Sequence, residues 1–445
     1  MADPAAGGMG LKKTSVGLAI ILALVSGLLG NGLNLNGFGA RAVSMGGAFV
    51  GLADDFTAVF WNPAGLALLS KGTFGLTGDL LVPKSTYFLN SSFDMKTKNR
   101  YYPAGLVGYF QPIGGRVVVG LGAYTLSGLG TDWNNTGFEA ALAYPTPPTF
   151  FTPPLENDIW RSFIGSITLA PSVAVKIADG IFFGATLNIN YGFFQTDQWG
   201  TSAVLPTKPP TLVNLGQQSL DIKGWGTGAT FGLLVKPSEW MSFGLTYRTQ
   251  SKMKLRGTMA IENIGLLGLP ASSETRLDVP SPTWLAGGVA VKTLENVTVT
   301  FDLQWTNWAK LSTLDVVFDE PSWAAALADE SAMVLDWKNR LQVRGGLEYT
   351  AGDFAIRAGY YHDPAPAPAE TMNVLIPSFT FNSFTAGFGY KKGGFKVDVG
   401  LEYLIGQKRT VTEGMMPGVS EMKIWVPMLA LGYGWGTLPT RSSLP

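Results

Sequence analysis

The chain has 445 residues, of which only 14% are charged, and its 32 Lys and Arg are balanced by 32 Asp and Glu. This balance excludes the strongly basic face on which nucleic-acid affinity depends, so nucleic acid is not an expected partner. The 56 glycines and 12% aromatic residues favour strands and aromatic belts, and the absence of cysteine excludes disulfides, thiolate metal sites and a cysteine nucleophile.

The first element in the chain is the apolar run Val16–Leu29, which follows Lys12 and Lys13. A basic start, an apolar stretch and small residues after it form the pattern of a secretory signal peptide, which we assign to residues 1–30, with Met9 as the natural start. No later run reaches the roughly 18 apolar residues that a membrane-spanning helix needs. A membrane protein with this sequence therefore has to be a barrel.

Residues 31–69 are rich in Gly, Ala and Asn and lack a sustained alternation of apolar and polar residues. The region is too small for an independent domain. Tethered to a barrel, it is expected to fill the lumen as a plug, because its small residues let the backbone turn close to the wall.

From residue 70 to residue 436 the dominant period is two, which predicts β-strands. Val297–Thr306, for example, has apolar residues at every odd position and polar residues at every even one. The same alternation in other strands places a polar set on the lumen side: Arg248, Asp302, Gln304, Arg344, Glu348, Arg357, Lys396, Asp398 and Glu402. We expect these residues to form a mutually paired, solvated wall, and specific contacts with a substrate are the alternative.

The connections between these strands alternate in length along the whole region. Tight turn signals are separated by long connections, near 82–100, 128–160, 197–216, 263–274, 319–338, 363–379 and 407–420. Six turns and seven long connections join fourteen strands, an order typical of outer-membrane barrels. The sequence therefore predicts an all-β fold: a fourteen-stranded antiparallel transmembrane β-barrel at 70–436, with an N-terminal hatch in its lumen and a tail at 437–445.

The plug region contains Asn-Gly-Leu-Asn-Leu-Asn-Gly-Phe at 31–38, Gly-Gly-Ala-Phe-Val-Gly-Leu-Ala-Asp-Asp at 46–55 and Phe-Trp-Asn-Pro-Ala-Gly-Leu at 60–66. In this order the segments resemble the hatch of the FadL family, outer-membrane transporters of long-chain fatty acids and aromatic hydrocarbons. The most specific part of the match is Asp54, Asp55, Asn62, Pro63 and Ala64. The predicted strand count agrees with the family's barrel, so the resemblance covers essentially the whole mature chain.

The resemblance implies that a hydrophobic ligand is caught at the outer loops, held in the lumen against the hatch, and released sideways through a kink in the third strand. Gly128, after the strand Val117–Ser127, falls where this opening is expected, and glycine admits the unusual backbone. An ordinary strand-end glycine is an equal alternative. The candidate ligand-binding residues, for which packing in the hatch core is the alternative, are Leu33, Leu35, Phe38, Phe60 and Trp61.

Two long connections carry apolar residues that are candidates for ligand capture or for packing among the loops: Leu205, Leu212, Leu215, Leu266 and Leu267. The expected partners are a hydrophobic small molecule such as a fatty acid or a hydrocarbon, outer-membrane lipid and the barrel assembly machinery. We expect a monomer. No cofactor and no metal are expected, because a single histidine, His362, makes a poor metal site.

Two other functions fit parts of the sequence. A scaffold or shuttle barrel of a type IX-like protein secretion system has a similar opening, but the length of this chain and its Asn-Leu-Asn-Gly-Phe segment favour the transporter. An outer-membrane lipase would need a Ser-His pair with an orienting acid. No nucleophile motif accompanies His362, so no enzymatic activity is expected.

Overall fold

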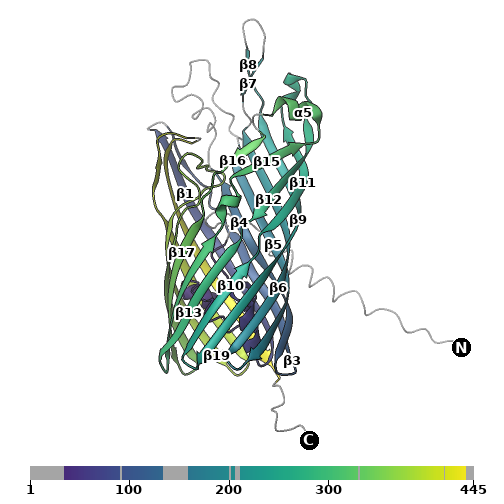
Figure 1. Cartoon of the computed structure of the whole chain (residues 1–445). Helices are drawn as coiled ribbons and strands as arrows, with labels where there is room; N and C mark the ends of the chain where they lie inside the picture. Colours follow the sequence, from purple (N-terminus) through teal and green to yellow (C-terminus); the bar gives the residue numbers. More distant parts are fainter. Residues whose placement is uncertain are drawn as a thin grey trace, which may run out of the picture.

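The computed structural model describes residues 35–90, 93–133, 159–199, 202–205, 211–328, 331–414 and 416–436. Its main element is a closed antiparallel β-barrel, which stands upright in Figure 1. Fourteen wall strands follow one another in chain order, and the last pairs with the first, from Gly72↔Trp435 to Phe88↔Val419. The predicted fourteen-stranded barrel is therefore confirmed. The predicted signal peptide and the tail at 437–445 lie outside the described residues.

Ten wall strands are continuous: β1 (Gly72–Asn90), β3 (Tyr102–Ile113), β4 (Val117–Asp132), β5 (Arg161–Ala178), β6 (Ile181–Trp199), β9 (Gln217–Ser238), β18 (Phe354–Asp363), β19 (Phe381–Lys392), β20 (Phe395–Gly406) and β22 (Gly418–Trp435). The other four are interrupted: β10 (Met241–Arg248) with β11 (Ser251–Ile261), β12 (Ser272–Ser281) with β13 (Trp284–Leu294), β14 (Val297–Thr306) with β15 (Thr313–Phe318), and β16 (Ala332–Val334) with β17 (Arg340–Ala351).

Shorter strands and helices lie in the connections between the wall strands. These are the strands β2 (Phe93–Lys96), β7 (Ser202–Leu205), β8 (Thr211–Asn214) and β21 (Arg409–Val411), the helix α5 (Pro321–Ala326), and the 3-10 helices η2 (Ile264–Leu267) and η3 (Trp308–Lys310). Within the described ranges, no helix is long and apolar enough to cross a membrane.

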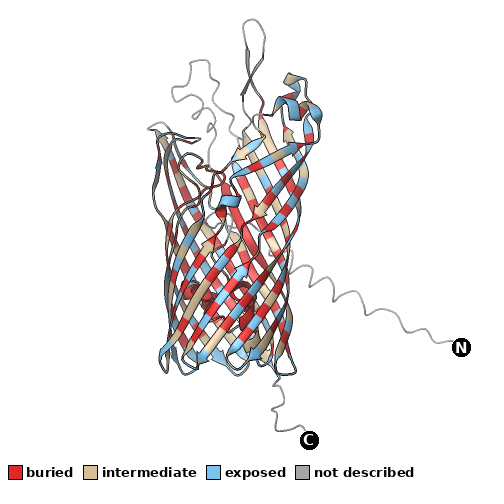
Figure 2. Cartoon of the chain, viewed as in Figure 1, coloured by how far each residue is buried: buried red, intermediate tan, exposed pale blue. Residues whose placement is uncertain are grey.

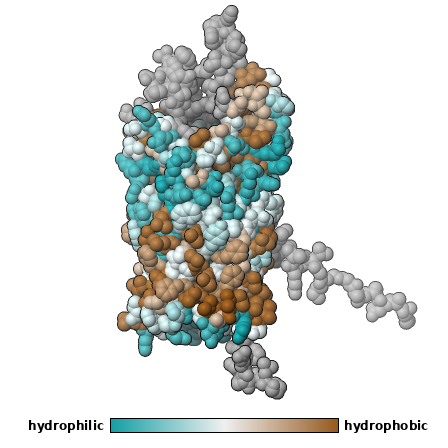
Figure 3. All heavy atoms as spheres, viewed as in Figure 1, coloured by the Kyte–Doolittle hydropathy of each residue, from teal (hydrophilic) through white to brown (hydrophobic). Residues whose placement is uncertain are grey.

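Burial and polarity are inverted in the wall relative to a soluble sheet. In β10 the side chains of Phe243 and Leu245 are exposed, whereas those of Thr246 and Arg248 are buried. Successive residues of a strand point to opposite faces, so the apolar set faces outward and the polar set faces the lumen. Figure 3 shows apolar residues gathered in the lower half of the wall, which is the part suited to contact lipid.

The wall is taller than a membrane requires. β9 has 22 residues and β1 has 19, whereas a tilted membrane strand needs only about 9–11. Higher in the wall the outward residues become polar, as at Lys252, Lys254 and Arg256 of β11, and Figure 3 shows a largely hydrophilic zone there. The barrel therefore projects beyond the hydrocarbon, as the strand lengths predict.

The two ends of the barrel differ in the way that the sequence predicts. The six tight turns lie at one end, the turn end, and the long connections at the other, the loop end (Figure 1). The start of the first long connection was predicted wrongly, because residues 82–90 continue β1 and pair with β22 as far as Phe88. The long connection therefore begins higher, since β1 and β22 extend each other's ladder above the membrane.

The N-terminal segment Leu35–Leu69, called the hatch below, lies inside the barrel near the turn end, and most of it is buried (Figures 1 and 2). It contains the helices α2 (Ala40–Ser44) and α3 (Ala58–Trp61) and the 3-10 helix η1 (Pro63–Leu68). Gly46 has a φ of +67°, and a Cβ at this position would lie 2.5 Å from the carbonyl oxygen of Gly345 in β17. Only glycine lets the hatch backbone approach the wall so closely.

Candidate functional site

The polar residues predicted to face the lumen do so, and several bind the hatch rather than water. Asp302 Oδ2 accepts a hydrogen bond from the Val50 amide at 2.9 Å, and Gln304 Nε2 donates to the Gly47 carbonyl at 3.2 Å. Both side chains are almost fully buried. The hatch is largely irregular, so its buried backbone groups need side-chain partners, and the wall supplies them. The expectation of a solvated wall is wrong at these positions.

Two arginines of the wall make the same kind of contact. Arg344 Nη1 donates to the Gly46 carbonyl at 3.1 Å, and Arg248 Nη2 donates to the Phe60 carbonyl at 2.9 Å. The guanidinium carbons lie 4.3 Å from the Tyr361 ring centroid and 4.8 Å from that of Phe60, respectively. Each arginine is therefore fixed both by a hatch carbonyl and by an aromatic face.

A buried ion-pair network ties α2 of the hatch to the wall at the turn end. Arg41 Nε lies 2.8 Å from Glu348 Oε2, and Arg357 Nε lies 2.6 Å from the same oxygen. Arg357 Nη1 also lies 2.8 Å from Asp398 Oδ1, so the network joins β17, β18 and β20. It borders a cavity of about 520 Å³ between the hatch and the tight turns.

The two hatch carboxylates of the sequence match extend this network. Asp54 pairs with the Arg41 guanidinium, and Asp55 Oδ2 lies 3.6 Å from Arg41 Nη1. Asp55 Oδ1 also accepts a hydrogen bond from the Thr57 amide at 2.9 Å, and Lys396 Nζ of β20 lies 3.8 Å from Asp55 Oδ2. These contacts hold the loop between the hatch helices in place.

Asn62 fixes the second half of the hatch. Its side-chain oxygen accepts from the Ala64 amide at 3.1 Å and caps η1, which starts at Pro63. Its Nδ2 donates to the Val50 carbonyl at 3.0 Å and to the Leu233 carbonyl of β9 at 3.1 Å. A proline at the first helical position and an Asn cap start a helix efficiently, so Asn62, Pro63 and Ala64 dock η1 on the wall.

Four of the five candidate ligand-binding residues come together, and Leu33 lies outside the described residues. Trp61 Nε1 donates to the Phe38 carbonyl at 2.9 Å, and the rings of Phe38 and Trp61 each pack edge-on against Phe60 at 5.1 Å. Phe38 and Trp61 have no exposed surface, whereas Leu35 retains 9%. Phe38 and Trp61 therefore form the hatch core, and Leu35 and Phe60 lie at its boundary with the lumen.

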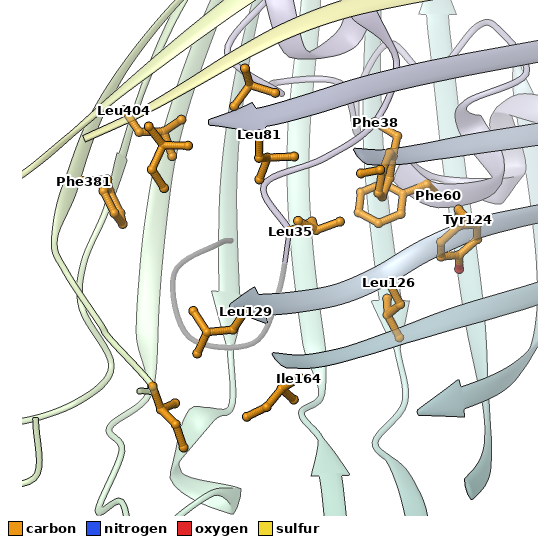
Figure 4. Close-up of a cluster of buried hydrophobic side chains, with 14 of the residues drawn as sticks. Leu35, Phe38, Phe60, Leu81, Tyr124, Leu126, Leu129, Ile164, Phe381 and Leu404 are labelled. Atoms are coloured by element: carbon orange, nitrogen blue, oxygen red, sulfur yellow. The ribbon is translucent and has the colours of Figure 1, made fainter. Parts of the chain in front are cut away.

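Figure 4 shows an apolar zone around Leu35 on the loop-end side of the hatch. Its wall residues are buried leucine, isoleucine and phenylalanine side chains from β1, β4, β5, β19 and β20: Leu81, Leu126, Leu129, Ile164, Phe381 and Leu404. This set, called the apolar zone below, offers oily contacts to a ligand above the hatch.

β4 departs from regular pairing beside the apolar zone. The β3–β4 ladder ends at Leu106↔Tyr124, although β3 begins at Tyr102 and β4 continues to Asp132. Above this point β4 pairs with β5, and pairing on its other side resumes at the hydrogen bond from the Lys98 amide to the Asp132 carbonyl, 2.8 Å, and the bridge Thr97↔Trp133. A Cβ at Gly130 would lie 3.3 Å from Tyr102 Cε1, so the tyrosine side chain covers part of the unpaired stretch.

The unpaired stretch also contains an irregularity. The β4–β5 register shifts at Leu126, and β4 then continues to Asp132 rather than ending at Ser127, as the sequence had suggested. Gly128 pairs regularly with Gly165, two residues after the bulge. All residues from 124 to 133 are buried, so both faces of this stretch are covered.

The five loop leucines do not form one group. Leu205 lies in β7 and Leu212 in β8, which pair as a hairpin. Leu266 is 55% exposed, and Leu267 is partly buried. Leu215 belongs to a buried cluster under α5 with Ile261, Ile264, Phe318 and Trp323. Leu215 therefore supports the loops, whereas Leu266 faces outward.

No His, Cys, Asp and Glu residues of the described ranges are grouped so as to hold a metal. His362 lies in β18, with its Nδ1 3.0 Å from Asn382 Oδ1. Asp79, which the sequence analysis overlooked, is 5% exposed on the lumen side of β1 between Thr77 and Leu81. The signal that identifies Asp79 is a carboxylate at a lumen-facing position of an otherwise apolar strand.

Relatives of similar length match most of the chain. The long-chain fatty acid transport protein of Salmonella typhi is 22% identical over 455 residues, which covers 93% of this chain and 96% of the relative. That of Escherichia coli strain K12 is 23% identical over 453 residues with the same coverage. A putative outer membrane protein of Neisseria meningitidis serogroup B is 22% identical over 422 residues, covering 86% and 87% of the two chains.

Solved structures share the fold. A Pseudomonas aeruginosa FadL homologue superposes with a TM-score of 0.74 at 15% identity, covering 91% of this chain and 100% of the other. The P. putida toluene transporter TodX gives 0.70 at 15% identity with the same coverage. The Ralstonia pickettii toluene transporter TbuX gives 0.68 at 18%, again with 91% and 100% covered. At these identities the likeness establishes the barrel fold.

The family described as outer membrane protein transport protein (OMPP1/FadL/TodX) matches residues 156–429, which is more than half of the chain. Its members are outer-membrane transporters and not enzymes, so the apolar band of the wall lies in the outer membrane. The chain therefore belongs to the outer membrane protein transport protein family (OMPP1/FadL/TodX).

Proposed function

We propose that this barrel takes up small hydrophobic molecules, either long-chain fatty acids or hydrocarbons, and releases them sideways into the membrane. The named functions of the relatives, long-chain fatty acid transport and toluene transport, support the substrate class. The observation that carries the proposal is the unpaired stretch of β4 beside the apolar zone. Monomeric assembly by the barrel machinery is part of the same proposal.

The hatch favours a sideways route over a straight one. Wall side chains from β14, β17 and β10 hold its backbone, so a ligand above it cannot pass to the turn end without breaking several buried contacts. Release into water would also be unfavourable, because each exposed methylene costs about 0.8 kcal/mol. A route from the apolar zone through the wall avoids both costs.

The unpaired stretch of β4 is suited to be the exit. Unpaired backbone groups facing lipid are expensive, and irregular backbone at membrane depth is tolerated where protein covers it. Burial of residues 124–133 and the ring of Tyr102 provide this cover. Gly128 lies within the stretch and presents no side chain, so we assign the exit to the interval between β3 and β4 around Gly128.

Ligand capture is proposed at the loop end. Leu266 is exposed there, and Leu205 and Leu212 lie in β7 and β8, which pair as a hairpin. Leu267, which is partly buried, would join the capture surface with them. Leu215 is assigned to support of the loops because it is 3% exposed.

The test of the exit is uptake of labelled oleate by cells that lack their own transporter and express Gly128→Trp. The bulky ring should abolish uptake while the barrel still assembles, as checked by the mobility shift of the unheated protein on a gel. Gly287→Trp is the matched control, because a Cβ at Gly287 in β13 meets only the Gly244 oxygen, at 4.0 Å.

Wild-type uptake by Gly128→Trp would refute the side exit, and loss of uptake in both variants would show a general effect of tryptophan on the wall. The rival function, a scaffold of protein secretion, predicts co-purification of a secreted protein and no oleate uptake by the wild type.

A further inference from the structure

The outer face of β9, β11 and β12 carries three cations side by side. Arg256 of β11 lies directly opposite Lys223 of β9 on one side and directly opposite Arg276 of β12 on the other. All three residues are exposed. Like charges that face one another across neighbouring strands destabilise a sheet. This set, called the cation row below, is therefore favourable only where an anion offsets the repulsion.

The cation row lies just above the hydrocarbon, toward the loop end. The next outward residue below Lys223 in β9 is Trp225, which is 62% exposed and packs against Tyr191 of β6 at a ring-centroid distance of 4.8 Å. Trp and Tyr gather where hydrocarbon meets head groups. The interval Trp225–Val235 matches the about 9–11 residues that a tilted strand needs to cross the hydrocarbon. Because the long loops of such barrels face the outside, the cation row lies among the head groups of the outer leaflet.

The carboxylates nearby leave most of the cation row without a counter-ion. Asp319 Oδ1 lies 2.6 Å from Arg276 Nη2 and neutralises one end of the row. Asp278, which lies below the row in β12, is 2.7 Å from Lys252 Nζ. Within the described ranges, the other two cations of the row are in no ion pair. The centre of the row is therefore free to bind an anion.

The outward residues above the cation row indicate the side from which an anion arrives. Asp221 of β9 and Glu274 of β12 both lie opposite Thr258 of β11, one outward position above the row. These carboxylates repel a soluble anion that approaches from the water outside. A lipid phosphate reaches the row from the membrane, with its acyl chains along the apolar wall. The order of aromatic, cationic and acidic residues therefore favours an anionic lipid over a free anion.

The same order occurs at a second place on the barrel. Lys84 of β1 lies directly opposite Lys423 of β22, and both are exposed. The next outward residue below Lys423 is Trp425, which is 42% exposed and stacks on Tyr403 at 4.0 Å, and the next one above is Glu421. Five wall strands, β1, β3, β4, β5 and β6, separate β22 from β9. The pattern therefore follows depth in the membrane and not one local contact.

From these observations we infer that the outer wall binds phosphorylated lipids of the outer leaflet, with their phosphate groups on the cation row and on the Lys84–Lys423 pair. Lipid A, the glycolipid base of lipopolysaccharide, carries phosphates of this kind. Arg256 is the central residue, because a guanidinium offers a fork of N–H donors to a phosphate. The inference concerns a surface outside the lumen and does not depend on the proposed uptake.

The test measures equilibrium binding of diphosphoryl lipid A to the purified full-length barrel in a non-ionic detergent, beside lipid A from which both phosphates have been removed. Wild type should bind the phosphorylated lipid more tightly, and less so as salt rises. Lys223→Gln combined with Arg256→Gln should weaken its binding by roughly 30-fold, the effect of losing two basic residues at an anionic membrane surface. Binding of the dephosphorylated lipid should change by less than about 2-fold, since a neutral head group needs no cation.

Two further variants separate the position of the charge from its amount. Lys292→Gln combined with Lys392→Gln removes two exposed lysines at the turn end, in β13 and β19, and is the matched control that should leave both lipids unchanged. Arg256→Lys should keep more affinity for the phosphorylated lipid than Arg256→Gln does, because it retains the charge but loses the fork.

Thermal unfolding in the same detergent separates lipid binding from a structural role. Without lipid A, Lys223→Gln combined with Arg256→Gln should unfold at a temperature no lower than that of wild type, because it removes a repulsion. Added diphosphoryl lipid A should raise the unfolding midpoint of wild type more than that of this variant, because a ligand stabilises the state that binds it.

Four results would overturn the inference. These are equal affinity of wild type for the two lipids, an equal loss of affinity in the turn-end control, a lower unfolding midpoint of the double variant without lipid, and displacement of diphosphoryl lipid A by inorganic phosphate at an equal concentration. The last result would mean that the row binds any phosphate. Each of them leaves the proposed uptake standing, because oleate uptake is measured separately.

Discussion

The two halves of the lumen are built from different chemistry. Toward the turn end, buried charged and amide side chains of the wall bind the hatch, as in the Arg41, Glu348 and Arg357 network. Toward the loop end, the wall is lined by the apolar zone. The same wall runs through both halves, with ten of its fourteen strands unbroken, and the difference lies mainly in which side chains occupy the inward positions. One barrel thereby combines a plug held by polar contacts with an apolar wall above it.

The difference also explains why a plug needs polar walls. The hatch is mostly irregular, and its buried amides and carbonyls must find hydrogen-bond partners. An apolar ligand has no such requirement and is held by burial alone. The polar half therefore retains a segment of the chain permanently, and the apolar half is suited to exchange its occupant.

The largest effect is expected when the polar half loses its central cation. Arg357→Ala leaves Glu348 and Asp398 buried with one partner fewer, which should destabilise hatch docking by about 3–5 kcal/mol. Limited proteolysis should then cut the hatch at protease levels that wild type resists. Arg256→Ala, on the outer face, should leave the digestion pattern unchanged, and a resistant Arg357→Ala hatch would contradict the role of the network.

A smaller loss of stability is expected when η1 of the hatch loses its N-cap residue, Asn62. Asn62→Ala removes the cap of η1 and leaves the Val50 and Leu233 carbonyls without this donor, at a cost of about 1–3 kcal/mol. Hydrogen exchange should rise in residues 62–69 and stay unchanged in the wall strands. Exchange that rises equally throughout the barrel would show that Asn62 supports the whole fold instead.

In the apolar half, truncation of a side chain should weaken ligand binding and leave the docking of the hatch unchanged. Leu404→Ala removes buried methyl groups from the apolar zone and should reduce oleate affinity by roughly 10-fold, the scale of about 1–2 kcal/mol of lost apolar contact. Proteolysis of the hatch should remain as in wild type. Loss of hatch protection together with affinity would show that the two halves are coupled.

The smallest effect on stability belongs to the loop end. Leu266→Ala changes a residue that is 55% exposed. The free energy of unfolding should therefore change by no more than about 0.5 kcal/mol, as is typical of surface sites. Uptake of oleate at low external concentration should slow, because capture loses an apolar contact. Leu215→Ala, in the buried cluster under α5, should instead lower the unfolding midpoint of the loops.

Strand count and lumen-facing residues could be predicted from sequence because a period of two fixes which side chains share a face. Arg248, Asp302 and Glu402 follow from that rule alone. Their partners could not be predicted, because contacts such as Asp302 with Val50 join residues 252 positions apart through an irregular segment. The bulge at Leu126 could not be predicted either, because a register shift depends on the pairing with the neighbouring strand. The sequence indicated an irregularity at Gly128 instead.

The hatch is part of the same polypeptide as the wall, and at Gly46 its backbone lies against the backbone of β17. On the proposed sideways route, hydrophobic nutrients cross the wall without an open channel for salts, sugars or large hydrophilic antibiotics. Making more copies of the protein should therefore increase the supply of its substrate while the permeability barrier of the envelope stays intact.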